Sequence, residues 1–129
     1  MESARARIIA AGLLLHDTEK LRVTVVFDGK GEAVGLEEVS GSPLCRVLYA
    51  PASMTADDLI EQLVGSASTP GEITVATGDR HERQTIEALG ATAISPELLR
   101  AWVERCEARQ TANVKRRSDA NPFTNALPL

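Results

Sequence analysis

The 129-residue sequence has few cysteines, few aromatic residues and no long apolar run, and each shortage excludes a class of protein. Its two cysteines lie far apart without the paired spacing of a zinc site, so we expect two reduced, buried thiols. Aromatic residues make up 3% of the chain, which excludes base stacking as the main means of holding nucleic acid. No run approaches the roughly 18–20 apolar residues of a transmembrane helix, and the N-terminus lacks the pattern of a secretory signal. We therefore expect a cytoplasmic protein without membrane contact.

Positive charge is also scarce, because 14 Lys and Arg residues face 18 Asp and Glu residues for a formal net charge of -4. This balance excludes a global basic field, so any contact with nucleic acid must use a local patch or a metal. The length and the 43% hydrophobic content are ordinary for one globular domain with a real core.

The chain does contain an alternation of apolar strands and amphipathic helices. Helices are predicted at residues 4–16, 55–64, 80–89 and 95–108, and strands at residues 21–27, 45–50, 73–77 and 91–94. Residues 29–41 are rich in glycine and acids without periodicity, which predicts a loop. The alternation predicts an α/β fold with a mostly parallel sheet of about four strands and helices on both faces. We expect one domain over residues 1–108 and a basic, proline-containing tail over residues 109–129.

Acidic residues follow three of the predicted strands. Asp28 ends the apolar run Val23–Phe27, which is typical of a strand buried on both faces, and Asp57 and Asp79 follow the next two strands. Parallel strands place their carboxyl ends at one edge of a sheet, so these acids are expected to converge. A divalent cation such as Mg²⁺ would neutralise the cluster, polarise a phosphodiester and lower the pKa of an attacking water.

Each of these residues also has a simpler interpretation. Asp79 is placed as a helix N-cap, Asp57 as a first-turn acid that complements the helix dipole, and Asp28 as part of a turn. Nearby cations could hold RNA phosphates or be solvated surface charges: Lys30, Arg80 and Arg83. The run Lys115-Arg116-Arg117 could be an electrostatic arm for RNA or the ribosome, or a solubilising tail.

Four stretches in order resemble the YacP-like NYN domains over roughly residues 4–107: Val-Val-Phe-Asp-Gly, Thr-Ala-Asp-Asp-Leu-Ile-Glu, Val-Ala-Thr-Gly-Asp-Arg and Gly-Ala-Thr-Ala-Ile-Ser-Pro-Glu-Leu-Leu. The resemblance implies a PIN-like, Rossmann-like three-layer fold and an endoribonuclease that hydrolyses single-stranded RNA with Mg²⁺ or Mn²⁺. It also implies catalytic metal ligands at Asp28, Asp57 and Asp79, with Asp58 and Thr77 in support around them.

The sequence departs from this family at its start. Family members begin with a strand that carries an Asp-Gly-Tyr-Asn motif, which is not present here before the helix expected from Ala4. The resemblance implies that this strand is central and brings a catalytic Asp, so one metal ligand is missing and a gap separates neighbouring strands. Three explanations stay open. The gene start is assigned too late, another chain (such as a second copy) completes the sheet, or the domain is a catalytically impaired module that binds RNA, the ribosome or a protein.

Overall fold

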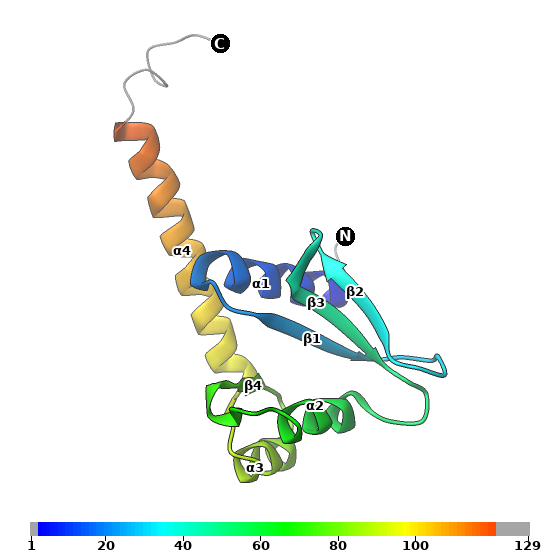
Figure 1. Ribbon diagram of the computed structural model, residues 1–129. Helices are drawn as coiled ribbons and strands as arrows, with labels where there is room; N and C mark the ends of the chain where they lie inside the picture. The colour runs from blue at the N-terminus through cyan, green and yellow to red at the C-terminus, as the bar shows by residue number, and fades with distance from the viewer. Residues whose placement is uncertain (1–2, 121–129) are drawn as a thin grey trace.

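The computed structural model describes residues 3–120 and has a mixed α/β fold, which confirms the predicted fold class (Figure 1). The elements in chain order are α1 (Ala4–Glu19), β1 (Val23–Asp28), β2 (Gly35–Val39), β3 (Ser42–Ala50), α2 (Ala56–Gly65), the 3-10 helix η1 (Pro70–Glu72), β4 (Thr74–Ala76), α3 (Arg80–Ala88), β5 (Thr92–Ile94) and α4 (Pro96–Ala120). Within the described residues, no helix has both the length and the apolar character needed to cross a membrane.

The strands are divided between two sheets instead of forming the single sheet expected from the sequence. In the larger sheet the order is β1-β3-β2, and β1 runs parallel to β3 with Asp28 opposite Ala50. In the smaller sheet β4 and β5 are parallel. Between residues 3 and 120 no strand joins β1 to β4. Val23–Phe27 is therefore an edge of its sheet and is only partly buried, so the prediction of a strand buried on both faces is wrong.

The prediction of a loop over residues 29–41 is also wrong, because Gly35–Val39 forms β2, which pairs antiparallel with β3. The chain reverses at Ser40 and Gly41, whose φ angles of 52° and 71° lie in the left-handed region that suits a tight hairpin. β2 is an edge strand with mostly exposed side chains, such as Leu36 at 57% exposure. β2 is held in place by backbone hydrogen bonds to β3 and not by burial of its side chains. Its sequence therefore shows little alternation of apolar and polar residues.

Helix α1 lies close against β1 at Gly12. A Cβ atom at this position would lie 3.2 Å from Val23 Cγ1 and 3.3 Å from Val25 Cγ2, so a glycine allows the close approach. Helix α2 then connects the two halves of the molecule. Its Leu59 packs with Leu48 and Ala50 of β3, whereas its Val64 packs with a second cluster made of Val75, Ile86 and Ala91.

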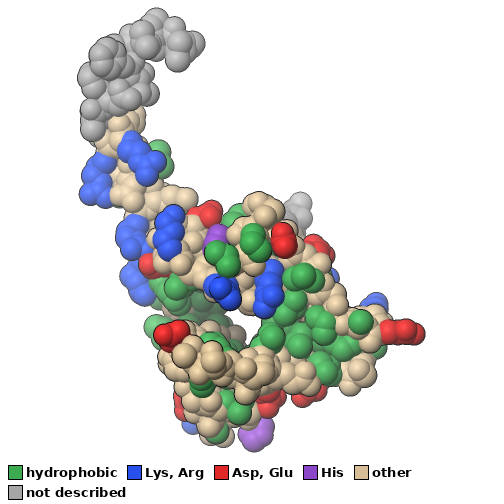
Figure 2. All heavy atoms as spheres, in the orientation of Figure 1, with side chains coloured by type: hydrophobic (Ala, Val, Ile, Leu, Met, Phe, Trp, Pro, Cys, Tyr) green, Lys and Arg blue, Asp and Glu red, His purple; other side chains and the backbone are tan. Residues whose placement is uncertain are grey.

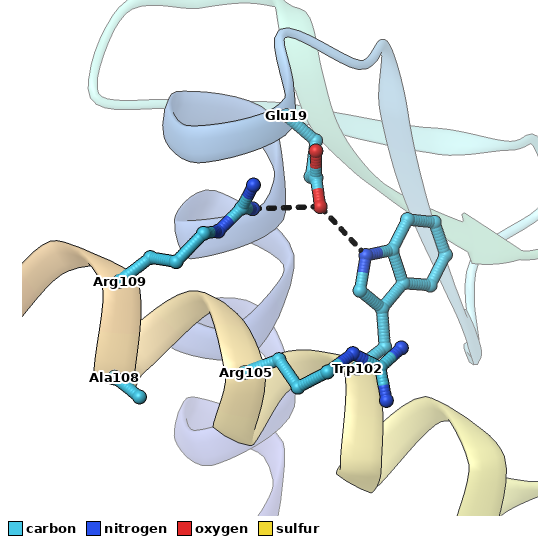
Figure 3. A pocket seen from close by; sticks show the side chains of 5 residues that line it. All are labelled: Glu19, Trp102, Arg105, Ala108 and Arg109. Carbon is cyan, nitrogen blue, oxygen red and sulfur yellow. Dashed lines mark hydrogen bonds and ion pairs between the residues drawn. The ribbon is translucent and has the colours of Figure 1, made fainter.

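Helix α4 packs on α1 and then projects away from the body of the molecule (Figure 1). Its Trp102 and Arg109 both contact Glu19 of α1 (Figure 3). Regular structure was expected to end near residue 108, but the helix continues to Ala120, so that expectation is wrong. The added turns contain good helix formers without an apolar stripe. Residues 121–129 lie outside the described residues, and the boundary between domain and tail stays a prediction. Both cysteines are free and buried, as expected.

Candidate active site

The end of β1 is fastened to the start of α2 by Asp28. Its Oδ1 accepts a hydrogen bond of 2.8 Å from the backbone N–H of Ala56, the first residue of α2. Asp57 is the next residue along that helix. Asp28 and Asp57, two of the acids predicted to converge, are therefore brought close together in space, although β1 and α2 are well separated in the sequence.

Asp57 lies within the electrostatic reach of acids from several elements. Burial raises the pKa of its carboxyl first, and the negative charges of Asp79, Glu61 and Asp28 raise it further, with Asp58 adding a smaller contribution. The structure thus gathers the end of β1, the first turns of α2 and the start of α3 into one acidic region. The catalytic role of these residues stays a prediction.

The simpler roles of the acids are also present. Asp79 caps α3, because its Oδ1 accepts from the backbone N–H groups of His81 at 2.8 Å and Glu82 at 3.2 Å. Asp58 and Thr55 form a capping box at the start of α2, in which each side chain accepts from the other residue's N–H at 3.1 Å. These caps hold the acidic residues in fixed positions, so a structural role and a chemical role are compatible here.

Glu82 of α3 belongs to the same region and was missed by the sequence reasoning. Its side chain is 6% exposed, and its Oε1 is buried without a hydrogen-bond partner among the described residues. Burial raises the pKa of Glu82 to about 7, and the charges of Asp57 and Glu61 contribute further. Glu82 lies within α3 and not next to a strand end, which is where the predicted acids lie. The spacing of three residues from Asp79 to Glu82, and of four from Asp57 to Glu61, places further acids one helical turn away and could have revealed them.

The side chains of this region suit a hard divalent cation in chemical kind. They offer carboxylate oxygens, which Mg²⁺ and Mn²⁺ prefer, and Oε1 of Glu82 is buried without a hydrogen-bond partner among the described residues. Among residues 3–120, no three acidic, histidine or cysteine side chains lie close enough together to hold one ion. The acids are therefore near enough to perturb one another but are not arranged as a closed metal cage.

Of the predicted supporting residues, Thr77 lies beside Asp79. Thr77 Oγ1 accepts from the backbone N–H of Asp79 at 3.2 Å, and the carbonyl of Thr77 accepts from Arg83 Nη1 at 2.7 Å. Arg83 of α3 is thus engaged with the backbone of the turn that precedes its helix, whereas Arg80 and Lys30 are exposed. The pair Thr77 and Arg83 fixes the turn that carries Asp79.

Comparison with known proteins now identifies the family. The profile of the YacP-like NYN domain matches residues 1–127. The chain belongs to this family. The YacP-like NYN domain is similar to the crystal structure of Rae1 (YacP) from Bacillus subtilis, with a TM-score of 0.76 and 29% identity over 95% of this chain and 70% of that one. The W164L mutant of the same protein gives a TM-score of 0.74 and 28% identity over 92% and 69%. No curated protein sequence matches the chain.

Membership of this PIN-like nuclease family supports a nuclease role related to RNA. The separation of the two sheets lies between β1 and β4, each of which has a strand partner on one side only within residues 3–120. The three explanations for the absent Asp-Gly-Tyr-Asn strand stay open.

Proposed function

We propose that this YacP-like NYN domain is a metal-dependent endoribonuclease that hydrolyses single-stranded RNA at its acidic region. The observation that supports the proposal is a chain of neighbouring acids. Asp28 and Asp79 raise the pKa of Asp57, Asp57 and Asp79 raise that of Glu82, and Glu82 Oε1 is buried without a hydrogen-bond partner among the described residues. Like charges held together at a cost in free energy indicate a site shaped for a cation.

In this proposal Asp28, Asp57 and Asp79 hold Mg²⁺ or Mn²⁺, and Glu82 adds a fourth carboxylate. Such an ion polarises the phosphodiester and lowers the pKa of the attacking water. Asp58 and Thr77 position the ligands, since Asp58 caps the helix that carries Asp57 and Thr77 holds the N–H of Asp79. The exposed side chains of Arg80 and Lys30 hold RNA phosphates near the acids.

A second candidate is a catalytically impaired module that binds RNA, the ribosome or a protein. Two observations favour it. No three of the described acids are close enough to share one ion, and β1 has an unpaired edge where a strand of a second copy could complete the sheet. This candidate predicts neither metal-dependent cleavage nor stabilisation by a metal.

The test uses labelled single-stranded RNA with Mn²⁺ and the full chain. Asp28→Asn and Asp79→Asn are each expected to lower cleavage by about a hundredfold or more, since a bound metal supplies several kcal/mol of transition-state stabilisation. Asn at position 79 retains an acceptor for the helix cap, so the fold is expected to persist.

Glu37→Gln on the exposed edge strand β2 is the matched control and should cleave as the wild type does. Full activity in both Asp variants would reject the site. A wild-type chain that neither cleaves RNA nor is stabilised by Mn²⁺ would reject the enzyme in favour of the binding module.

A further inference from the structure

Helix α4 separates its charges around its axis. At 3.6 residues per turn, Arg105, Arg109 and Arg116 fall within a stripe about 40° wide. The acids of the same segment, Glu104 and Glu107, lie at least about 100° away from these arginines. The sequence as a whole has a net charge of -4, so this stripe is a local reversal of the prevailing charge.

An open hollow of about 350 Å³ lies beside this stripe, between the end of α1 and α4. It is lined by three cations, one acid and two amide side chains: Lys20, Arg109, Arg117, Asp17, Gln110 and Asn113. Figure 2 shows the Lys and Arg side chains gathered along α4 and next to α1 in that view. We name Lys20, Arg105, Arg109, Arg116 and Arg117 the α4 basic surface.

Existing contacts hold part of this surface in place. Arg109 Nη2 donates to Glu19 Oε1 at 2.8 Å, which anchors the guanidinium between α1 and α4 while its side chain stays 56% exposed. Arg116 donates to the Oδ1 of Asn113, one turn earlier on the helix. Arginines held in position lose less side-chain entropy when they bind a further anion.

The chemistry of the surface favours a nucleic-acid backbone over a protein partner. The core of a protein interface needs apolar or aromatic anchors, and Val114 is the one large apolar side chain that lines the hollow. Arginine side chains bind phosphate oxygens through charge-assisted hydrogen bonds, and such contacts are common at nucleic-acid interfaces. From Arg105 to Arg116 the stripe covers about 16 Å of helix, a length along which several backbone phosphates fit.

We propose that the α4 basic surface binds the phosphate backbone of single-stranded RNA, apart from the acidic region where cleavage is proposed. The inference rests on the proposed function for the choice of RNA among polyanions. The two surfaces have different roles. The arginines on α4 bind RNA without a metal, and the acids contact RNA only through a bound cation.

The test measures RNA affinity by fluorescence anisotropy with EDTA present, so that no metal-dependent cleavage takes place. The variant Lys20→Gln/Arg116→Gln/Arg117→Gln leaves Arg109 and its contact with Glu19 intact. We expect about tenfold weaker binding at moderate salt, and a slope of log affinity against log salt that is shallower by about two. The control Arg7→Gln/Arg22→Gln/Arg100→Gln removes the same charge from exposed positions outside the α4 basic surface and should stay within about twofold of the wild type.

Equal losses in both triple variants would show that net charge alone matters, and would overturn the proposal. Wild-type affinity in the first variant would overturn it too, as would binding of an acidic peptide in preference to RNA. The Asp79→Asn variant separates this inference from the proposed function. It should bind RNA in EDTA as the wild type does, even if its cleavage with Mn²⁺ is lost or was never present.

Discussion

Two glutamates of this domain have opposite surroundings. Glu19 at the end of α1 accepts hydrogen bonds on Oε1 from Trp102 Nε1 at 2.9 Å and Arg109 Nη2 at 2.8 Å (Figure 3). The bond from Trp102 is the main cause that lowers the pKa of Glu19, and Cys106 and Arg109 lower it further. Glu82 on α3 faces other acids, and its pKa rises to about 7.

The difference between the two residues lies in their partners. Glu19 is matched by donors from α4 and acts as a tether between two helices. Glu82 has a buried oxygen without a partner among the described residues, in a region that already holds negative charge. Free energy is thus gained at the tether and lost at the acidic region, where either a bound cation or protonation of Glu82 would recover it.

The comparison is tested most strongly by the variant Glu82→Gln, for which we expect the largest change in the stabilisation that Mn²⁺ gives in a thermal melt. At a metal concentration about 100 times Kd, the wild type should gain about 2.7 kcal/mol in the free energy of unfolding. Gln lacks the charge that holds the ion, so the variant should lose most of this gain. Without metal it should be at least as stable as the wild type. Glu87→Gln on the exposed side of α3 is the control, and an unchanged Mn²⁺ effect in Glu82→Gln would remove Glu82 from the ligand set.

A smaller effect is expected from pH in the metal-free protein. The pKa of Glu82 is raised from the ordinary 4.5 to about 7 on folding. Its contribution to stability is therefore fully present below pH 4.5 and is lost as the pH rises through 7. The free energy of unfolding should fall by about 1–2 kcal/mol between the two ends of this window, after allowance for local relaxation. Glu82→Gln should flatten the profile, and parallel profiles for variant and wild type would contradict the assignment.

The features that sequence could predict are those fixed by neighbouring residues. Asp79 caps α3 as expected, and Ser3 and Thr55 cap their helices in the same way, because a cap is decided within three or four positions. Gly90 ends α3 with a φ of 97°, which is the conformation that favours glycine at a helix end. The apolar runs of β1 and β3 were recognised for the same reason.

The features that sequence could not predict depend on distant partners or on the absence of burial. The edge strand β2 has little apolar patterning, and the last turns of α4 have none. Trp102 meets Glu19 across 83 positions of the chain, and no local spacing indicates that pair. The burial of Glu82 beside Asp57 and Glu61 depends on how α2 packs on α3, so only the fold reveals that its Oε1 is buried without a hydrogen-bond partner among the described residues.

The smallest effect is expected at the tether, where partially exposed charges are screened by solvent. Glu19→Ala removes the acceptor for Trp102 and Arg109, and should lower the melting temperature by a few degrees. Glu19→Gln keeps an acceptor for the indole N–H but loses the charge, so its melting temperature should lie between those of the wild type and Glu19→Ala. Trp102 is the single tryptophan, and its fluorescence should shift to the red as α4 loosens from α1. Glu104→Ala on the outer side of α4 is the control. Stabilisation by Mn²⁺ should be the same in Glu19→Ala as in the wild type. A change would contradict the comparison, because it would show that the contact between α1 and α4 is energetically coupled to the acidic region.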